Sequence, residues 1–235
     1  MSKKINVGVV FGGRSAEHEV SLMSAKSLVN AMNKDKYNVH LIGITHQGQW
    51  LYADSSTNAL EHKTVDEQTL LPTRIDFSNA TSLLVNNAES GNNEILANLD
   101  VIFPVLHGPY GEDGTIQGLF ELSNVAYVGC GVAASAIAMD KAMAKNAFKA
   151  AGLLQMDYQV YKLSQFNNDQ HAVLQQITDT FDFPVFVKPA NMGSSIGISK
   201  AHDNNELLIA INDAFKYDNK IIIERYDNLN LNPAS

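Results

Sequence analysis

A group of residues suited to binding phosphate lies in the stretch 186–199, which reads FVKPANMGSSIGIS. An apolar run ends in Lys188, and the loop after it places Gly193, Ser194, Ser195 and Gly197 almost side by side. Glycines let backbone N–H groups approach a ligand, serines add hydroxyl donors, and lysine supplies a compact positive charge. The order differs from a P-loop, because the lysine precedes the glycines. The pattern favours a lid over a polyphosphate, and the alternative is a flexible hairpin with an incidental lysine.

A second group, HGPYGEDGTIQG at 107–118, follows an apolar run and leads into a helical pattern. Open α/β sheets bind ligands at this kind of strand-to-helix connection, and the first N–H groups of the helix favour anions. The alternative is that Glu112, Asp113 and Thr115 only cap the helix while the glycines shape the turn. Capping accounts for Asp113 but leaves His107 and its neighbouring glycines unexplained.

A third group, GGRSAEHEV at 12–20, lies at the end of the first apolar run. It lacks the G-x-G-x-x-G pattern, so a dinucleotide fingerprint is not supported. One interpretation is a strand–helix turn whose acidic residues complement the helix dipole. The other is that the carboxylate of Glu17 binds a substrate cation.

Composition limits the classes of partner. The chain has 235 residues, of which 45% are hydrophobic and 18% charged, as expected for a soluble globular protein. Its formal net charge of -8 argues against nucleic-acid binding, so any anion site must be local. A single cysteine suits a reducing cytosol. No run is long enough to cross a membrane, and the first residues do not fit a signal peptide. We expect a cytoplasmic protein.

The elements that position these groups alternate between strands and helices in the first part of the chain. This alternation predicts a doubly wound parallel sheet. The stretch 46–49 predicts a hairpin turn, and 53–98 is polar and weakly patterned, with one possible strand at Ser82 to Val85. Strands are expected at 5–11, 37–44 and 101–106, and helices at about 17–33 and 115–122.

The pattern changes near 129–131, which predicts two domains, 1–129 and 130–235. Asp140 can cap a helix that runs to Ala151 and places Met143, Ala144, Ala147, Phe148 and Ala151 on one face. Strands are expected at 158–163, 185–188 and 220–225, with a hairpin around the phosphate-type loop and a capping box at 203–206.

Five segments share their order with motifs of one enzyme family. They are GGRSAEHEVS at 12–21, HGPYGEDGTIQG at 107–118, MDK at 139–141, VKPANMGSSIG at 187–197 and IIER at 222–225. Together they resemble the D-alanine–D-alanine ligases of the ATP-grasp superfamily, along essentially the whole chain. The resemblance implies an N-terminal Rossmann-like (pre-ATP-grasp) domain followed by the first α+β lobe of an ATP-grasp domain.

The resemblance also implies a reaction. The family phosphorylates the carboxylate of one D-alanine with ATP, and the amine of a second D-alanine attacks the acyl phosphate to give a dipeptide for peptidoglycan precursors. Glu17 resembles the carboxylate that holds the first ammonium group, and Val20 and His107 resemble neighbours of that substrate. Ser194 resembles a serine that ties the phosphate-covering loop to the substrate site.

The family's nucleotide contacts also match positions in this chain. Lys141 and Lys188 resemble the two lysines on the ATP phosphates, and the loop after Lys188 resembles the phosphate cover. The segment that begins at Glu224 falls where the family contacts adenine, partly through backbone. The nucleotide-binding set implied by the resemblance is Lys141, Lys188, Gly193, Ser194, Ser195, Gly197, Glu224, Arg225, Tyr226 and Asp227.

In the family, a second lobe carries the ligands of Mg²⁺ or Mn²⁺. The resemblance therefore implies no metal ligand within this chain, a sequence truncated before that lobe, and no turnover by the 235 residues alone. Two alternatives stay open: a D-alanine–D-lactate ligase, and a non-catalytic ligand-binding module on the same scaffold. The implied partners are small molecules and a second copy bound through the N-terminal region, with neither nucleic acid nor membrane.

Overall fold

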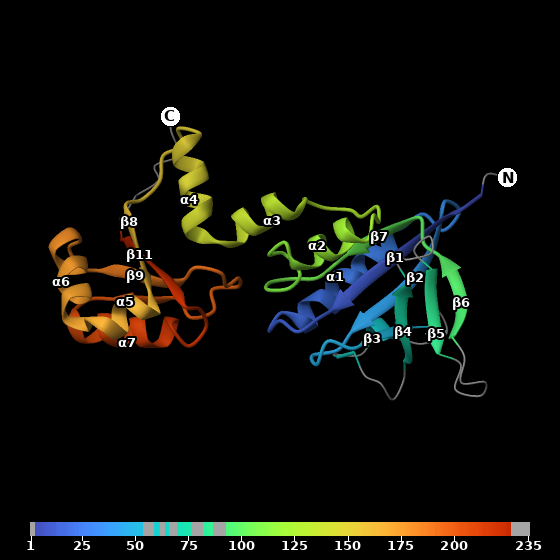
Figure 1. The fold of residues 1–235 in the computed structure, drawn as a ribbon, viewed down its shortest axis with the longest axis horizontal. Helices are drawn as coiled ribbons and strands as arrows, with labels where there is room; N and C mark the ends of the chain where they lie inside the picture. The colour runs from blue at the N-terminus through green and yellow to red at the C-terminus, as the bar shows by residue number, and fades with distance from the viewer. Residues whose placement is uncertain are drawn as a thin grey trace. The chain divides into compact units, whose positions relative to one another are not determined.

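The computed structural model describes residues 3–53, 59–61, 64–65, 70–76, 82–86 and 93–226, and it divides into two compact units. The first unit is Met1–Ala136 and the second is Ile137–Ser235 (Figure 1). The division falls within α3 (Val132–Met139), whereas the sequence places the domain boundary between 129 and 130. That domain assignment stays a prediction.

The first unit contains a seven-stranded sheet in the order β6-β5-β4-β3-β2-β1-β7. Only β1 pairs in parallel on both sides, with β2 and β7, and the other pairs are antiparallel. The expected α/β class with a parallel sheet is confirmed, and the weakly patterned stretch adds an antiparallel extension. The short connections from β4 to β5 and from β5 to β6 allow only antiparallel pairing. The strands are β1 (Ile5–Gly12), β2 (Tyr37–Ile44), β3 (Trp50–Ala53), β4 (Leu71–Asp76), β5 (Ser82–Asn86), β6 (Asn93–Asn98) and β7 (Val101–Pro104).

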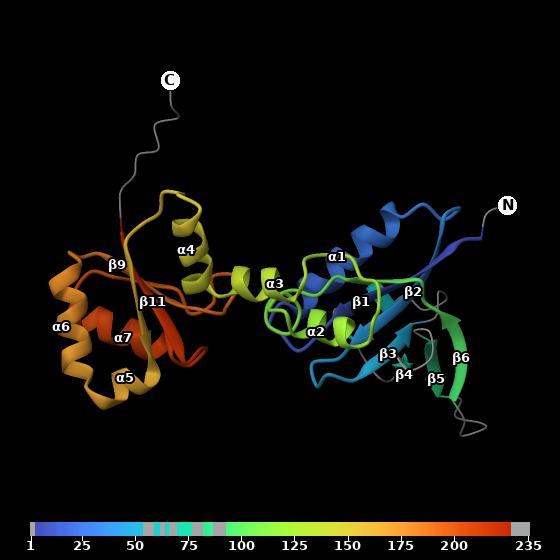
Figure 2. The same ribbon diagram turned by 45° about the horizontal axis from the view of Figure 1, so that its top comes forward.

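Two helices cover opposite faces of this sheet. Side chains alternate along β1, so Val9 packs with Leu22 of α1 (His18–Ala31), while Val10 packs with Phe120 of α2 (Thr115–Leu122). Figure 2 shows α1 and α2 on the two sides of β1. The first helix was expected to begin near Glu17. It begins one residue later, so Glu17 is the N-cap and its side chain makes no capping hydrogen bond.

The second unit is a four-stranded antiparallel sheet in the order β10-β9-β11-β8. The expected hairpin around the phosphate-type loop is confirmed as β9–β10. The helices α5 and α6 were not predicted. The elements are α4 (Lys141–Ala150), β8 (Tyr158–Lys162), α5 (Leu163–Asn168), α6 (Gln170–Thr180), β9 (Val185–Pro189), β10 (Ser199–Ala201), α7 (Asn204–Ala214) and β11 (Lys220–Arg225).

The two faces of the second sheet have different roles. On β9 and β11, Val187 and Ile223 join the core formed with α5, α6 and α7. Their strand neighbours Lys188 and Glu224 therefore point to the other face, where α4 lies alongside. The predicted apolar face of α4 is exposed at Met143 and Phe148, and the helix turns Lys145 toward the sheet.

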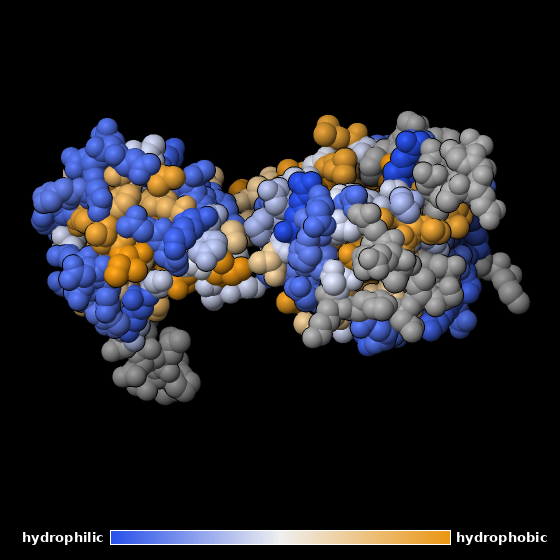
Figure 3. All heavy atoms as spheres, turned by 90° about the horizontal axis from the view of Figure 1, so that it is seen from below, coloured by the Kyte–Doolittle hydropathy of each residue, from blue (hydrophilic) through white to orange (hydrophobic). Residues whose placement is uncertain are grey.

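On the face seen in Figure 3, hydrophobic residues form small groups that hydrophilic residues surround. None of the helices in the described parts of the chain has the length and apolar character needed to cross a bilayer.

His18 anchors the loop that follows β1. Its side chain is fully buried, its Nδ1–H donates to the carbonyl of Gly13 at 2.7 Å, and the N–H of Val65 donates to its Nε2 at 3.1 Å. The ring stacks on His46 with 4.0 Å between centroids. Burial lowers the pKa of His18, and the neighbouring His46 lowers it further, against the hydrogen bond to Gly13 and the charge of Glu19. The imidazole is thus held neutral.

This arrangement predicts a pH-dependent stability of the first unit. The unfolded chain takes up a proton on His18 below its ordinary pKa of 6.5, while the folded state resists it. The free energy of unfolding therefore falls as the pH falls from about 6.5 toward the lower folded pKa. In His18→Asn we expect a loss of about 1–3 kcal/mol at pH 8, because the Val65 N–H loses its acceptor, and a flatter profile between pH 7 and pH 5.

The measurement is urea unfolding followed by the fluorescence of Trp50, which reports on the first unit because the chain has one tryptophan. His171→Asn is the control, since this exposed histidine lies on α6 in the second unit. An equally steep profile in His18→Asn and wild type would contradict the anchoring role.

Candidate functional site

The first and second sequence motifs meet at one edge of the first sheet. Strands β1 and β7 are parallel neighbours, so their carboxyl ends lie together, and the loops 12–17 and 107–114 both leave from that edge. This is where an open α/β sheet positions ligand-binding side chains.

Serine hydroxyls from the first motif and α1 tie these two loops together. Ser15 Oγ donates to the carbonyl of His107 at 2.7 Å, and Ser24 Oγ shares a hydrogen bond of 2.9 Å with His107 Nε2. Ser21 Oγ donates to the carbonyl of Val105 and accepts from the N–H of Gly12 at 2.7 Å. The imidazole of His107 is therefore held by α1 as well as by its own loop.

Acidic side chains gather at the same edge. A Cβ added to Gly108, which has φ +69°, would collide with Oε2 of Glu17, so only glycine lets this carboxylate lie against the second loop. Glu112 Oε2 accepts from the N–H of Gly108 at 2.8 Å, and its Oε1 lies 3.7 Å from His107 Nδ1. Two carboxylates and one imidazole can receive an ammonium group here.

Asp113 has the structural role that its position predicts. Its carboxylate accepts from the N–H groups of Thr115 at 3.0 Å and Tyr110 at 2.8 Å. Burial would raise the pKa of Asp113, but hydrogen bonds from the Thr115 side chain and from these N–H groups outweigh it and lower the pKa. Asp113 fixes the start of α2 rather than facing a ligand.

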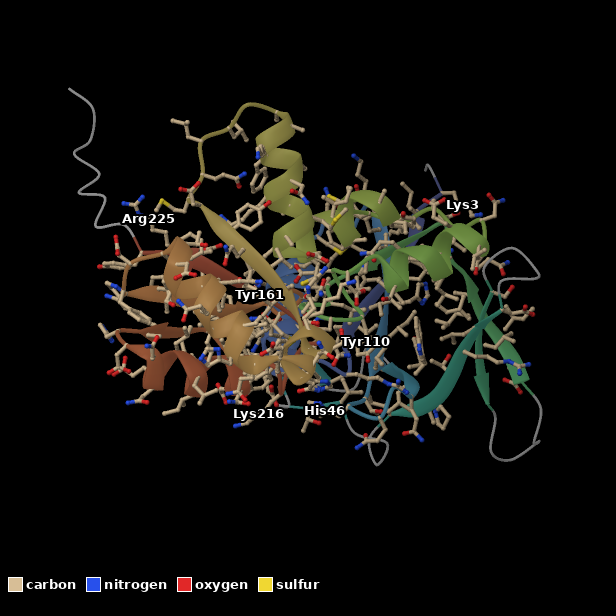
Figure 4. The ribbon with its side chains drawn as sticks, turned by 60° about the vertical axis from the view of Figure 1, so that its left-hand side comes forward. Lys3, His46, Tyr110, Tyr161, Lys216 and Arg225 are labelled. Atoms are coloured by element: carbon tan, nitrogen blue, oxygen red, sulfur yellow. The ribbon has the colours of Figure 1, made fainter. Side chains whose placement is uncertain are left out.

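A cavity of about 240 Å³ opens among the loops at this edge. Its walls include Arg14, His107 and Tyr110, together with apolar side chains such as Trp50 and Leu119. Figure 4 labels Tyr110 on the β7–α2 loop and His46 on the β2–β3 turn. Val20, which was expected near the substrate, lies in the first turns of α1 and is 44% exposed.

In the second unit, three lysines surround one carboxylate. Lys188 Nζ makes an ion pair with Oε2 of Glu224, and Lys145 Nζ lies 3.2 Å from Oε1. Lys141 Nζ donates to the carbonyl of Met192 at 2.5 Å. Burial lowers the pKa of Lys141, and the charge of Lys188 lowers it further, against Glu224 and other carboxylates. The positive charge in this group exceeds the negative, so the face can accept an anion.

The loop between β9 and β10 has the backbone expected of a phosphate cover. Ser194 and Ser195 adopt positive φ angles of 46° and 60°, and Gly197 has φ +69°. A Cβ on Gly197 would lie 2.6 Å from Tyr217 Cδ2, so a larger residue does not fit. Asp218 holds the base of the loop by accepting from Asn191 N at 2.7 Å and Nδ2 at 2.8 Å. Positive φ at serine is strained, and such strain is concentrated at ligand-binding segments.

The structure brings most of the expected nucleotide residues together, but not all. Lys141, Lys188 and Glu224 lie on one face of the second sheet, beside the loop. Arg225 follows Glu224 on β11, so its side chain points to the opposite side, and it is exposed at the strand end (Figure 4). The ring of Tyr226 packs against Phe186 in a tilted arrangement, with 5.7 Å between the ring centroids. Asp227 lies outside the described residues.

Sequence reasoning missed several members of these groups. Lys145 could have been found, because it lies one helical turn after Lys141 on the same face. Phe186 could have been found two residues before Lys188 on the same strand. Ser24 and Lys200, whose Nζ lies 3.6 Å from the Tyr226 ring centroid, gave no local signal. Among the residues that the structure describes, no three His, Cys, Asp or Glu side chains group as metal ligands.

Family models match both parts of the chain. The model described as the D-ala D-ala ligase N-terminus matches residues 6–130, and that described as the D-ala D-ala ligase C-terminus matches residues 147–230.

Curated relatives agree with these matches. A D-alanine–D-alanine ligase of Acetivibrio thermocellus is 46% identical over 238 residues, which cover 97% of this chain and 63% of that protein. A D-alanine–D-alanine ligase of Chloroherpeton thalassium is 47% identical, over 96% of this chain and 62% of that protein. The chain thus spans less than two thirds of the length of these relatives.

Solved structures share the fold. The VanG D-Ala:D-Ser ligase of Enterococcus faecalis has a TM-score of 0.83 and 34% identity, over 96% of this chain and 64% of that one. The D-alanine–D-alanine ligase of Coxiella burnetii has a TM-score of 0.80 and 32% identity, over 96% and 62%. On these matches and the two family models, the chain belongs to the D-alanine–D-alanine ligase family.

Proposed function

We propose that the protein acts as an ATP-dependent ligase that joins two D-alanines into D-alanyl-D-alanine, with an acyl phosphate as intermediate. The observation that carries this proposal is the excess of lysine over carboxylate on one face of the second sheet, beside a strained glycine–serine loop. This face occurs in a chain whose relatives are named as D-alanine–D-alanine ligases.

The residues of this face fit a nucleoside triphosphate. ATP supplies the phosphoryl group that activates a carboxylate. Lys141 and Lys188 neutralise phosphate charge, and the loop N–H groups donate to phosphate oxygens while the loop excludes water. Glu224 can only accept hydrogen bonds, so it suits the amino group of adenine and not the phosphates. The Phe186–Tyr226 pair offers an aromatic surface beside it.

The edge of the first sheet is proposed to bind the first D-alanine. Glu17 neutralises the ammonium group, and His107, held by Ser24 and Glu112, is placed beside it. The roles of Val20, Ser194 and Ser195 rest on the resemblance, as do Mg²⁺ or Mn²⁺, the homodimer, the cytoplasmic location and peptidoglycan precursor synthesis.

A second candidate differs in the second substrate. One structural neighbour is a D-Ala:D-Ser ligase, so D-serine is a candidate acceptor alongside D-alanine and D-lactate. The discriminating experiment offers D-alanine with each acceptor in turn and identifies the product by mass spectrometry.

The direct test uses the protein at the length that its gene encodes, with ATP, Mg²⁺ and D-alanine. We expect phosphate release that depends on D-alanine, and a dipeptide product. ATP binding without product would favour a non-catalytic module instead. The same assay tests the prediction that the 235 residues alone release no phosphate above background.

Glu17→Gln tests the ammonium site. The substitution keeps the size of the side chain and removes its charge, so we expect the KM for the first D-alanine to rise about tenfold or more while the KM for ATP barely changes. Glu19→Gln, two residues along the same helix turn and exposed, is the matched control. Equal losses for both substrates would indicate a folding defect and contradict the assignment.

Lys188→Met tests the phosphate site. It removes a charge that faces the transferring phosphate and leaves Lys145 paired with Glu224, so we expect the KM for ATP to rise and kcat to fall by about 10²-fold. Lys162→Met, an exposed lysine at the end of β8, is the control, and thermal unfolding checks that both variants fold. Wild-type kinetics in Lys188→Met would remove this lysine from the site.

A further inference from the structure

Lys145 shares the carboxylate of Glu224 with Lys188. Each carboxylate oxygen has its own ammonium group: Oε1 lies 3.2 Å from Lys145, and Oε2 is paired with Lys188. The side chains of Lys145 and Glu224 are only 15% and 11% exposed. A buried carboxylate with both oxygens occupied by charged donors is held in one orientation.

Lys145 differs from Lys141 in what it contacts, although both lie on the same face of α4. Lys141 donates to the loop at Met192, whereas Lys145 reaches the sheet. Lys145 Nζ also lies 5.2 Å from the ring centroid of Tyr158, whose hydroxyl donates to Asn146 at 2.9 Å. These contacts direct Lys145 at β8 and β11 and leave Lys141 as the lysine of α4 that contacts the loop.

The charge of Glu224 depends on both lysines. Burial would raise the pKa of Glu224, but the hydrogen bond from Lys188 and the charges of Lys188 and Lys145 outweigh it and lower the pKa. When one ion-pair partner of a buried carboxylate is removed, the remaining negative charge is less well compensated. The pKa of the carboxyl group then rises, or its side chain moves. A protonated or reoriented Glu224 would accept hydrogen bonds less well.

We propose that Lys145 is a positioning residue that holds Glu224 ionised and oriented to receive the amino group of the nucleotide base. The proposal rests on the proposed function, because it requires that the site binds ATP. Lys145 then acts on the base through Glu224 and does not touch the phosphates. Removal of the Lys145 side-chain charge must therefore lower the affinity for adenosine and the affinity for ATP by the same factor.

The experiment compares the binding of ATP and adenosine by isothermal titration to wild type, Lys145→Met, Lys145→Arg and Lys149→Met. Lys149 is the matched control, since it lies one turn further along α4 and is exposed. We expect Lys145→Met to weaken both ligands about tenfold, Lys145→Arg to recover most of the loss, and Lys149→Met to bind as wild type.

A loss confined to ATP would make Lys145 a phosphate ligand and overturn the proposal, and unchanged binding of both ligands would reduce its role to packing and also overturn it. Wild type that binds neither ligand would overturn the proposed function and this inference together. A measurement without ligand distinguishes failure of the proposed function from failure of the positioning role. NMR titration of the Glu224 carboxyl should show a higher pKa in Lys145→Met than in wild type and Lys149→Met. An unchanged pKa would overturn the positioning role whatever the nucleotide results.

Discussion

Alternation of side chains along β9 and β11 is the constraint on which the second unit depends. Residues that follow one another on a strand point to opposite faces, so Val187 and Ile223 enter the helical core while Lys188 and Glu224 face α4. A shift of register by one residue would bury both charges among the apolar side chains of α5, α6 and α7. The free energy of burying the core therefore also fixes the positions of the charged group.

The first unit positions its polar side chains by a different device. Parallel strands β1 and β7 end at one edge, and hydroxyl groups of Ser15, Ser21 and Ser24 then hold the two loops together. The tight contact between Glu17 and Gly108 shows why glycine follows His107, since any side chain there would displace the carboxylate. The residues around the motif thus serve to hold the few side chains that can meet a ligand.

Uninterrupted apolar runs with clear ends were predicted well from sequence. The bounds of β2, α2 and β11 agree with the prediction. In each segment the apolar residues follow the spacing of one kind of element, and polar or turn-forming residues mark where it ends. Strands β4 and β6 of the antiparallel extension were missed, since their described side chains are exposed or half-buried and give no pattern typical of a buried strand. Strand β5, which buries Leu83 and Leu84, was expected at Ser82 to Val85. The apolar face expected on α4 is exposed at Met143 and Phe148, because the helix contacts the carboxylate of Glu224 through Lys145 on another face.

The candidate site shows the same division between local and long-range information. The glycine and serine content of 193–197 was enough to predict a ligand-binding loop, and Lys188 was recognised as a charge at the end of a predicted strand. The partnership of Lys145 with Glu224 was not, because it joins a helix to a strand far along the chain and only the folded sheet brings them together. Arg225 shows the converse, since its place beside Glu224 in sequence puts its side chain on the other side of the strand.

Charge distribution explains why such precise local grouping is needed. The chain carries 25 acidic against 17 basic side chains, so its overall field repels phosphate and attracts ammonium. An anion can be held only where lysines outnumber carboxylates within a few ångströms, at short range and partly shielded from water. The face around Glu224 meets that condition with lysines from α4 and β9. The edge around Glu17 and Glu112 has the opposite charge. The described chain thus holds two polar groups of opposite sign, each fixed by its own unit, and this is the arrangement that the proposed pair of substrates, one with an ammonium group and one with phosphates, requires.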